Sequence, residues 1–492
     1  LVLSLGGDRD RAVKGGINAL LDLLVSEDES KEEKSSKQVS YYPEQEIIYL
    51  GPDENMTNEL ITWVPAQAAR RGYQYAKAFM SSKPGAGINH KEYGVTSEGV
   101  HVYVDYTLRF LKIDPNKERF TVKMTGGPDG DVAGNELKIL HREYGENARV
   151  VAIADGLGAA YDPEGLNWTE LLRLVKSSLS ISLFNKEKLS KKKGSFVIKA
   201  EDKKTIKQRN ELHFLAEADI FIPAGGRPYT VNNKNWNKFI LGSGKLSCKA
   251  IVEGANIFFT EDARNNLQKE GMYIIKDSSA NKTGVICSSY EIIASLLLND
   301  SEFTQIKDKY VNEVIEILKL KAGKEAKLLF FEYRKNRGNK NLVLLSKEIS
   351  SEINQVTDTL LEDFTERKNN ILKEKLSQDI ILRHCPSVLR NKYEKRILEQ
   401  LPDTHQIAIL ASYIASHIVY NEGLGWISTV GAGEHYEAVM TYMDSYQRVG
   451  ELVEAVKKSQ MSEKEKVMAV LKRSAARDLT VLSLETKVKT NQ

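Results

Sequence analysis

The alternation of apolar and polar residues between about 118 and 287 predicts short strands separated by helices. The expected strands are RFTVKM, ARVVAIAD, DIFIP, KAIVEGA and MYIIKD, and a helical pattern covers about 132–144. Strands that alternate with helices pair in parallel through helical crossovers. This part of the chain therefore predicts an α/β fold with a Rossmann-type, doubly wound sheet.

The chain before this region has a mixed pattern. LVLSL at residues 1–5 and IIYL at 47–50 are expected strands, and helices are expected around 17–24 and 60–69, the second with Pro65 inside it. The charged segment 26–39 is expected to be a solvated loop, and the lysine-rich stretches 186–194 and 203–207 are expected to be surface insertions. Residues 1–112 are assigned to part of an α/β substrate domain and 113–287 to the nucleotide domain.

From about residue 289 onward the pattern is helical almost throughout. The segment HQIAILASYIASHIVYNEGLG has apolar residues at helical spacing and ends in glycine, so a buried helix is expected there. We assign 288–492 to a C-terminal helical region. The family resemblance described below implies that this region closes the cleft and contributes oligomer contacts.

Composition narrows the class of protein. Lys and Arg number 70 and Asp and Glu 67, which gives a net charge of +3 and no sign of nucleic-acid binding. The three cysteines are far apart, so neither a metal site nor a disulfide framework is expected, and no apolar run is long enough to cross a membrane. Because the chain opens on Leu1 in an expected interior strand, we expect an upstream part, and the sequence leaves cytoplasm and mitochondrial matrix equally open.

A glycine-rich turn follows the first strand of the nucleotide domain. Gly127 and Gly130 lie in the turn, and Asp131 and Val132 open the next helix. Glycines allow the backbone to approach a diphosphate, and a helix N-terminus supplies free N–H groups. The spacing is not GxGxxG, so a plain tight turn stays open as the alternative.

An acidic residue ends the next strand. Asp155 lies 25 residues after Gly130, where an acid accepts hydrogen bonds from ribose hydroxyls and repels a 2′-phosphate. This favours NAD over NADP as the cofactor. The alternative is a helix-capping Asp.

Further motifs, taken in order, resemble those of the amino-acid dehydrogenases, and most closely the large NAD-dependent glutamate dehydrogenases. They are YLGPDEN, GVTSEGV, GGPDGD, YDPEGL, GGRP, VEGAN, KDSSAN and the late SYIAS segment, and the resemblance runs from residue 1 to about 425. The resemblance implies oxidative deamination of glutamate to 2-oxoglutarate and ammonium by hydride transfer to NAD, in a homo-oligomer. A related amino-acid dehydrogenase and a weakened NAD-binding assembly subunit are the alternatives.

The resemblance also implies roles for single residues. Asp53 corresponds to the acid/base carboxylate and Ser288 to the serine that binds the substrate's side-chain carboxylate. Thr96 is expected at the substrate and nicotinamide. The residues expected to contact the cofactor are Pro223, Ala224, Asn256 and Asn281.

Departures from the family pattern are also present. By register, the family's catalytic lysine falls before Leu1, with Lys14 of VKGG as the alternative. Ala224 stands where the family usually has Cys, and Thr283 where it has Gly. His90, in a loop, is expected to be structural.

Overall fold

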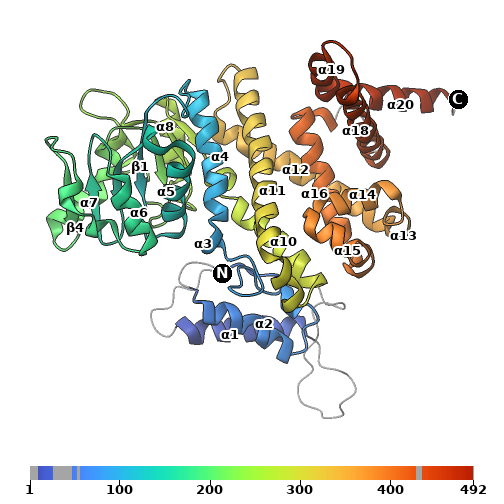
Figure 1. The fold of residues 1–492 in the computed structure, drawn as a ribbon, viewed down its shortest axis with the longest axis horizontal. Helices are drawn as coiled ribbons and strands as arrows, with labels where there is room; N and C mark the ends of the chain where they lie inside the picture. The colour runs from blue at the N-terminus through green and yellow to red at the C-terminus, as the bar shows by residue number, and fades with distance from the viewer. Residues whose placement is uncertain (1–8, 26–46, 53–55, 428–434, 491–492) are drawn as a thin grey trace. The chain divides into compact units, whose positions relative to one another are not determined.

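The computed structural model describes residues 9–25, 47–52, 56–427 and 435–490 (Figure 1). The chain divides into two compact units, one of residues 1–326 with 341–343 and the other of 327–340 with 344–492. The division falls within helix α11 (Asp300–Lys335). Each unit is described by itself below.

A seven-stranded sheet organises the first unit, in the order β4-β3-β2-β1-β5-β6-β7. The strands are β1 (Phe120–Thr125), β2 (Ala148–Ala154), β3 (Gly158–Tyr161), β4 (Phe196–Lys199), β5 (Ala218–Pro223), β6 (Cys248–Val252) and β7 (Tyr273–Ile275). The predicted Rossmann-type α/β fold is confirmed. The expectation of parallel pairing throughout is wrong at β3, which is antiparallel to β2 and to β4. Only three residues separate β2 from β3, too few for a helical crossover.

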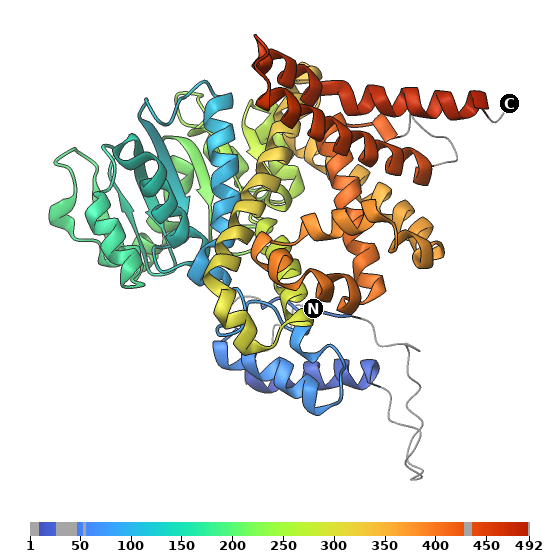
Figure 2. The ribbon, with the colours of Figure 1, turned by 45° about the vertical axis from the view of Figure 1, so that its right-hand side comes forward.

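Helices cover both faces of the sheet (Figures 1 and 2). Helices α4 (Val95–Phe110), α5 (Asp131–Tyr144) and α6 (Trp168–Lys176) form one layer, and α7 (Lys203–Leu215) and α8 (Glu261–Lys269) lie on the other face. The expected insertion at 203–207 is wrong, because these lysines form the first turns of α7 behind a capping box of Asp202 and Thr205. Residues 186–194 do form a largely exposed loop, with a 3-10 turn at Lys186–Lys188.

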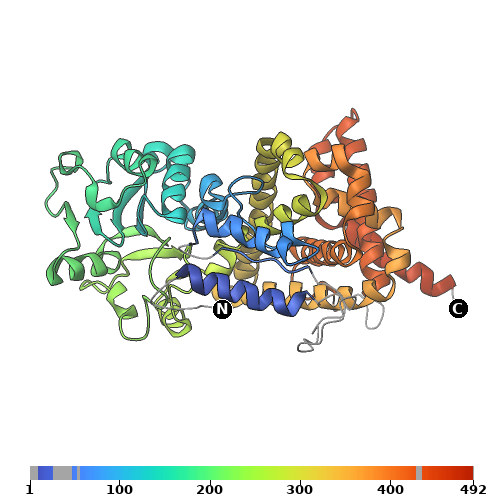
Figure 3. The same cartoon turned by 90° about the horizontal axis from the view of Figure 1, so that it is seen from below.

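The residues before the sheet form a small helical layer. Helices α1 (Arg9–Leu24) and α2 (Asn58–Arg70) lie side by side (Figure 3), and Leu21, Val64 and Phe79 are fully buried in their shared core. Pro65 lies within α2 without ending it. The strand expected at 47–50 is wrong, because it is reduced to one bridge between Leu50 and Met80. Residues 1–5 and 26–39 lie outside the described residues.

The rest of the described chain is helical, as predicted. Its elements are α9 (Asp277–Ala280), α10 (Thr283–Leu297), α11, α12 (Leu342–Glu366), α13 (Lys368–Ile371), α14 (Lys375–His384), α15 (Ser387–Gln400), α16 (Asp403–Glu422), α18 (His435–Lys458), α19 (Lys464–Val470) and α20 (Ala476–Thr490). The expected buried helix is α16, which ends at Gly423 with φ 84°. Helices α18 and α20 run side by side (Figure 2). Among the helices of the described chain, none is long and apolar enough to span a membrane.

Candidate functional site

The carboxyl ends of β1 and β5 mark the topological switch point of the sheet, where the order of the strands reverses. The chain moves from β1 to β2 on one side and later returns to β5 on the other. Ligands of open α/β sheets bind in the crevice outside such a pair of strand ends. Gly126 follows β1 and Ala224 follows β5, and the Ala224 amide donates to the carbonyl of Thr125 at 2.9 Å. The candidate site lies next to this contact between the turn after β1 and the turn after β5.

The turn after β1 accepts only glycine at two positions. Gly126 has φ +92°, and a Cβ there would lie 2.9 Å from the amide nitrogen of Gly225. A Cβ at Gly127 would lie 2.3 Å from Asp129 Oδ1 and 2.5 Å from Asp155 Oδ2. Both positions of this turn therefore leave no room for a larger side chain.

Helix α5 starts directly from this turn. Its N-cap residue, Gly130, is extended and offers no side chain to the first N–H groups, which begin at Asp131 and Val132. An uncapped helix N-terminus beside a glycine turn binds anions, and the diphosphate of a dinucleotide fits this combination. Val132 Cγ1 would lie 3.1 Å from a Cβ at Gly254, so the turn after β6 also closes on this helix end.

Asp155, after β2, is buried and surrounded by donors. Its carboxylate accepts hydrogen bonds from the amides of Leu157 and Gly158, both at 2.9 Å, from the amide of Ile181 at 2.7 Å, and from the hydroxyl of Ser180 at 2.8 Å. A carboxylate has about four lone-pair positions, and four donors already use them. The ribose role stays a prediction, and a ribose hydroxyl would have to replace one of these donors. Ser180 was not singled out from the sequence.

The opposite wall comes from the turns after β5, β6 and α9. Pro223 accepts a hydrogen bond from the Ala255 amide at 2.7 Å. The side-chain amide of Asn281 donates to Asn256 Oδ1 at 2.6 Å and to the carbonyl of Gly254 at 3.2 Å. Two residues predicted separately from the sequence are thus in contact.

The VEGAN turn is held from behind by a buried ion pair. Arg264 bonds to both carboxylate oxygens of Glu253 at 2.7 Å, and both side chains are almost fully buried. Burial raises the pKa of Glu253 to about 7, although Arg264 lowers it. The pair fixes the backbone that carries Asn256.

Ser288 lies on α10 and is buried, with its hydroxyl 3.1 Å from the hydroxyl of Ser81. The Ser81 amide donates to the carbonyl of Leu50 at 2.9 Å, and a Cβ at Gly51 would lie 3.9 Å from Ser81 Oγ. The segment that leads into Asp53 therefore reaches the serine pair, which consists of Ser81 and Ser288. Asp53 itself lies outside the described residues.

Thr96, in the first turn of α4, lies against the start of α10. A Cβ at Gly284 would be 2.7 Å from Thr96 Oγ1, so Gly284 leaves the space that Thr96 occupies. The hydroxyl of Thr283 donates to the carbonyl of Val95 at 2.9 Å. The Thr283 departure from the family pattern is therefore accommodated within this contact between α4 and α10.

His90 and Lys14, the two other candidates from the sequence, lie in different surroundings. His90 opens α3 (His90–Tyr93), its amide donates to Ser82 Oγ at 3.2 Å, and burial lowers its pKa. Its Nε2 atom is buried without a hydrogen-bond partner among the described residues. Lys14, in α1, has its ammonium 5.6 Å from the ring centre of Trp63. His90 is thus beside the serine pair's loop, and Lys14 contacts an aromatic ring of the helical layer.

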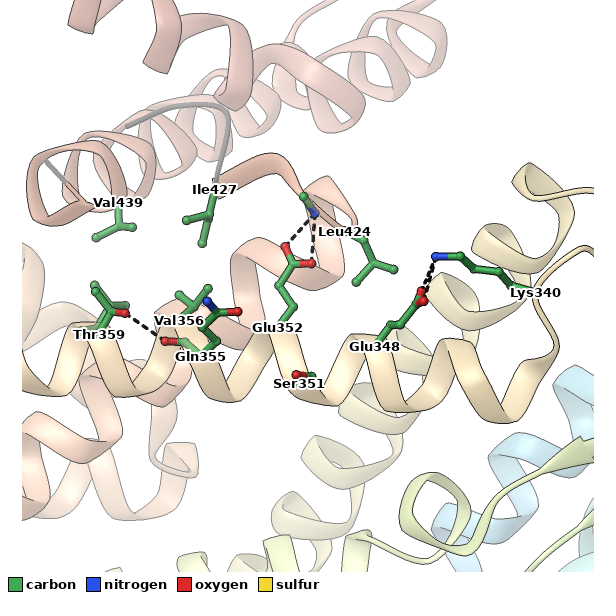
Figure 4. A pocket seen from close by; sticks show the side chains of 12 residues that line it. Lys340, Glu348, Ser351, Glu352, Gln355, Val356, Thr359, Leu424, Ile427 and Val439 are labelled. Atoms are coloured by element: carbon green, nitrogen blue, oxygen red, sulfur yellow. Dashed lines mark hydrogen bonds and ion pairs between the residues drawn. The ribbon is translucent and has the colours of Figure 1, made fainter. Parts of the chain in front are cut away.

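No group of three or more His, Cys, Asp or Glu residues that could hold a metal occurs in the described part of the chain. A pocket of about 510 Å³ lies in the second unit, along α12 and residues 424–427 (Figure 4). There the Lys340 ammonium pairs with Glu348 at 2.8 Å, and Glu352 accepts the Gly425 amide at 2.7 Å (Figure 4). None of the predicted site residues that the structure describes lines this pocket.

Comparison with known proteins agrees with this architecture. Residues 86–332 match the family model described as Glutamate/Leucine/Phenylalanine/Valine dehydrogenase, and the chain belongs to this family. That stretch contains the glycine turn, the VEGAN turn, α4 and α10.

Among individual relatives, glutamate dehydrogenase 2 of Dictyostelium discoideum is 35% identical over 434 residues, which cover 83% of this chain and 39% of the relative. The NAD-specific glutamate dehydrogenase of Neurospora crassa is 34% identical over 445 residues, covering 85% and 40%. The chain thus spans about two fifths of the length of these curated relatives. Among solved structures, the hetero-hexameric glutamate dehydrogenase from Thermus thermophilus is 18% identical with a TM-score of 0.46, covering 69% of this chain and 67% of that one.

Proposed function

We propose that this chain carries the NAD-binding site and part of the substrate site of an NAD-dependent glutamate dehydrogenase. The observation that carries the proposal is the convergence of two sets of residues in one unit. An uncapped helix end behind a glycine turn suits a dinucleotide, and the buried hydroxyls of Ser81 and Ser288 suit a substrate carboxylate. Relatives named as NAD-specific glutamate dehydrogenases support the choice of cofactor and substrate.

In the proposed reaction, glutamate loses a hydride from Cα to the nicotinamide of NAD. Water then converts the resulting imine to 2-oxoglutarate and ammonium. Ser288 binds the side-chain carboxylate of glutamate, and Thr96 and Asn256 orient the reacting groups. Asp53 is proposed to carry protons between the substrate nitrogen and water, which requires a carboxyl group within hydrogen-bond reach. A homo-oligomer is proposed as the assembled form.

The test uses the purified polypeptide. The binding of NADH is measured by its fluorescence, and the binding of 2-oxoglutarate by calorimetry on the NADH-saturated protein. NADH formation is then followed with glutamate, leucine, phenylalanine or valine as substrate, and with NAD or NADP. We expect binding of NADH and 2-oxoglutarate, and any turnover to require glutamate and NAD. A folded protein that binds NADH but neither binds 2-oxoglutarate nor oxidises glutamate would contradict the proposal.

A matched pair of variants tests the substrate role of Ser288. Ser288→Ala should weaken 2-oxoglutarate binding by about tenfold, which corresponds to one lost hydrogen bond to a charged group. Ser289→Ala is the control, because its hydroxyl donates to the carbonyl of Ile286 within the same helix. Equal effects of the two substitutions would remove Ser288 from the substrate site.

A further inference from the structure

Glu291 lies three residues after Ser288 on α10, on the same face of the helix, with its side chain 1% exposed. Its carboxylate accepts hydrogen bonds from the backbone amides of Ser82 at 2.8 Å, Ile88 at 3.2 Å and Lys83 at 3.3 Å. Both ends of the segment 82–88 are therefore attached to a single side chain.

The fit between this segment and Glu291 is close. A Cβ at Gly87 would lie 2.4 Å from Glu291 Oε1 and 2.8 Å from the carbonyl oxygen of Lys83. Ser82 has φ +60°, a conformation that costs a non-glycine residue about 1 kcal/mol or more. The hydrogen bond from the Ser82 amide to Glu291 helps to hold that conformation, so the shape of the segment depends on the carboxylate.

The charge of Glu291 is compensated within the same contact. The ammonium of Lys83 lies 2.8 Å from Glu291 Oε1, and it also donates to the carbonyl of Met80 at 2.8 Å and to Ser295 Oγ at 3.2 Å. A buried carboxylate is tolerable when it is paired and fully hydrogen-bonded. Because the Lys83 ammonium has all these partners, it serves to fix the segment and is not free to activate water.

The segment held by Glu291 begins next to the serine pair. Ser81 is fully buried and precedes Ser82 directly, and its hydroxyl accepts the hydrogen bond from Ser288. Ser82 Oγ in turn accepts the amide of His90. A displacement of Ser82 would therefore move both the Ser81 hydroxyl and the start of α3.

We propose that Glu291 is a positioning residue for the substrate's side-chain carboxylate. It fixes the segment 82–88 so that Ser81 and Ser288 present their hydroxyls together, although it does not touch the substrate itself. This inference rests on the proposed function, and it adds a residue that determines how well the carboxylate is held.

The experiment compares two variants with one control. Glu291→Gln keeps the shape of the side chain but loses the charge and places an amide against the backbone N–H groups. Glu291→Asp keeps the charge but is one methylene shorter, and it serves if the first variant folds poorly. Glu352→Gln is the matched control, because Glu352 is also a helix residue whose carboxylate accepts a backbone amide, that of Gly425, but it lies outside the proposed site.

The readout is the dissociation constant of 2-oxoglutarate on the NADH-saturated protein, together with that of NADH. We expect Glu291→Gln to weaken 2-oxoglutarate binding by about tenfold or more, with NADH binding within about twofold of the parent. Glu291→Asp should have a smaller effect in the same direction, and Glu352→Gln should leave both constants unchanged. A purely structural role would weaken both ligands together.

Two outcomes distinguish a failure of this inference from a failure of the proposed function. If the parent binds both ligands and the two Glu291 variants bind 2-oxoglutarate as the parent does, or lose NADH to the same extent, the inference is wrong and the proposed function stands. If the parent binds NADH but neither binds 2-oxoglutarate nor oxidises glutamate, the proposed function fails and the inference fails with it.

Discussion

Thr283 Oγ1 occupies the space that a side chain at Gly99 would need, since a Cβ at Gly99 would lie 2.2 Å from it. Thr283 is buried, and its hydroxyl is held by the carbonyl of Val95. Alanine is favoured over glycine in a helix by about 1 kcal/mol, but overpacking a core costs ~1–3 kcal/mol. We therefore expect Gly99→Ala to lower the free energy of unfolding, as measured by urea denaturation.

Two comparisons isolate this contact. Adding Thr283→Gly to Gly99→Ala should recover part of the lost stability, because the clash disappears. Gly450→Ala in α18 should instead be neutral or stabilising, because a Cβ at Gly450 has no heavy atom within 4 Å. Additive effects of the Gly99 and Thr283 substitutions would contradict the proposed contact.

The sequence predicted the structural features that form between residues close together in the chain. The glycine turn is a local event between a strand and a helix, so its composition identified Gly127 and Gly130. The pairing of Ser81 with Ser288 joins positions 207 residues apart, and the attachment of Ser82 to Glu291 joins positions 209 apart. Neither pair has a local pattern that reveals its partner. Only the packing of α10 against the segment 82–88 defines this part of the site.

The sequence singled out Asp155 for a ribose contact, which stays a prediction, but it did not reveal the internal hydrogen-bond partners of the carboxylate. Because four internal donors use its carboxylate, Asp155→Asn should destabilise the protein without any nucleotide present, by ~1–3 kcal/mol for an unsatisfied buried group. Thermal unfolding of the nucleotide-free protein measures this. Asp129→Asn, at an exposed position of the glycine turn, is the control and should change stability little. An unchanged stability of the Asp155 variant would show that its internal bonds are dispensable.

Lys123 predicts a stability change at alkaline pH. Its ammonium is buried in β1 and donates to the carbonyls of Ala216 and Ser247, yet burial lowers its pKa to about 8. Between about pH 8 and 10.5 the unfolded chain binds more protons, so stability should rise with pH in this window. The buried charge of Lys123 lowers the free energy of unfolding by up to roughly 3 kcal/mol below pH 8, and this penalty disappears as the pH rises towards 10.5. Lys123→Met should flatten this rise in urea denaturation measured from pH 8 to 10, and an unchanged slope would contradict the assignment.

His213 predicts a change at acidic pH. It is buried on α7 against Phe214 and Phe221, and burial lowers its pKa to about 3, with Lys123 adding repulsion. Protonation favours the unfolded chain, so stability should fall as pH drops below about 6.5. In His213→Phe this fall should be smaller than in the parent between pH 6.5 and 4. His141→Phe is the control, because His141 on α5 is only half-buried, with its ring against Trp168. An equal effect of that substitution would remove His213 as the cause.

The Arg264–Glu253 pair behind the VEGAN turn gives the last prediction. Arg264→Leu leaves the Glu253 carboxylate buried without its partner, and breaking a buried pair in this way costs roughly 3–5 kcal/mol. Because the pKa of Glu253 is already raised to about 7, the variant should regain stability as pH falls and the carboxyl becomes protonated. The deficit should therefore be larger at pH 8 than at pH 6 in urea denaturation. Arg173→Leu is the control: Arg173 binds both oxygens of Glu170, but its side chain is 48% exposed, so its loss should change stability little. A deficit that does not depend on pH would mean that Arg264 acts through packing alone.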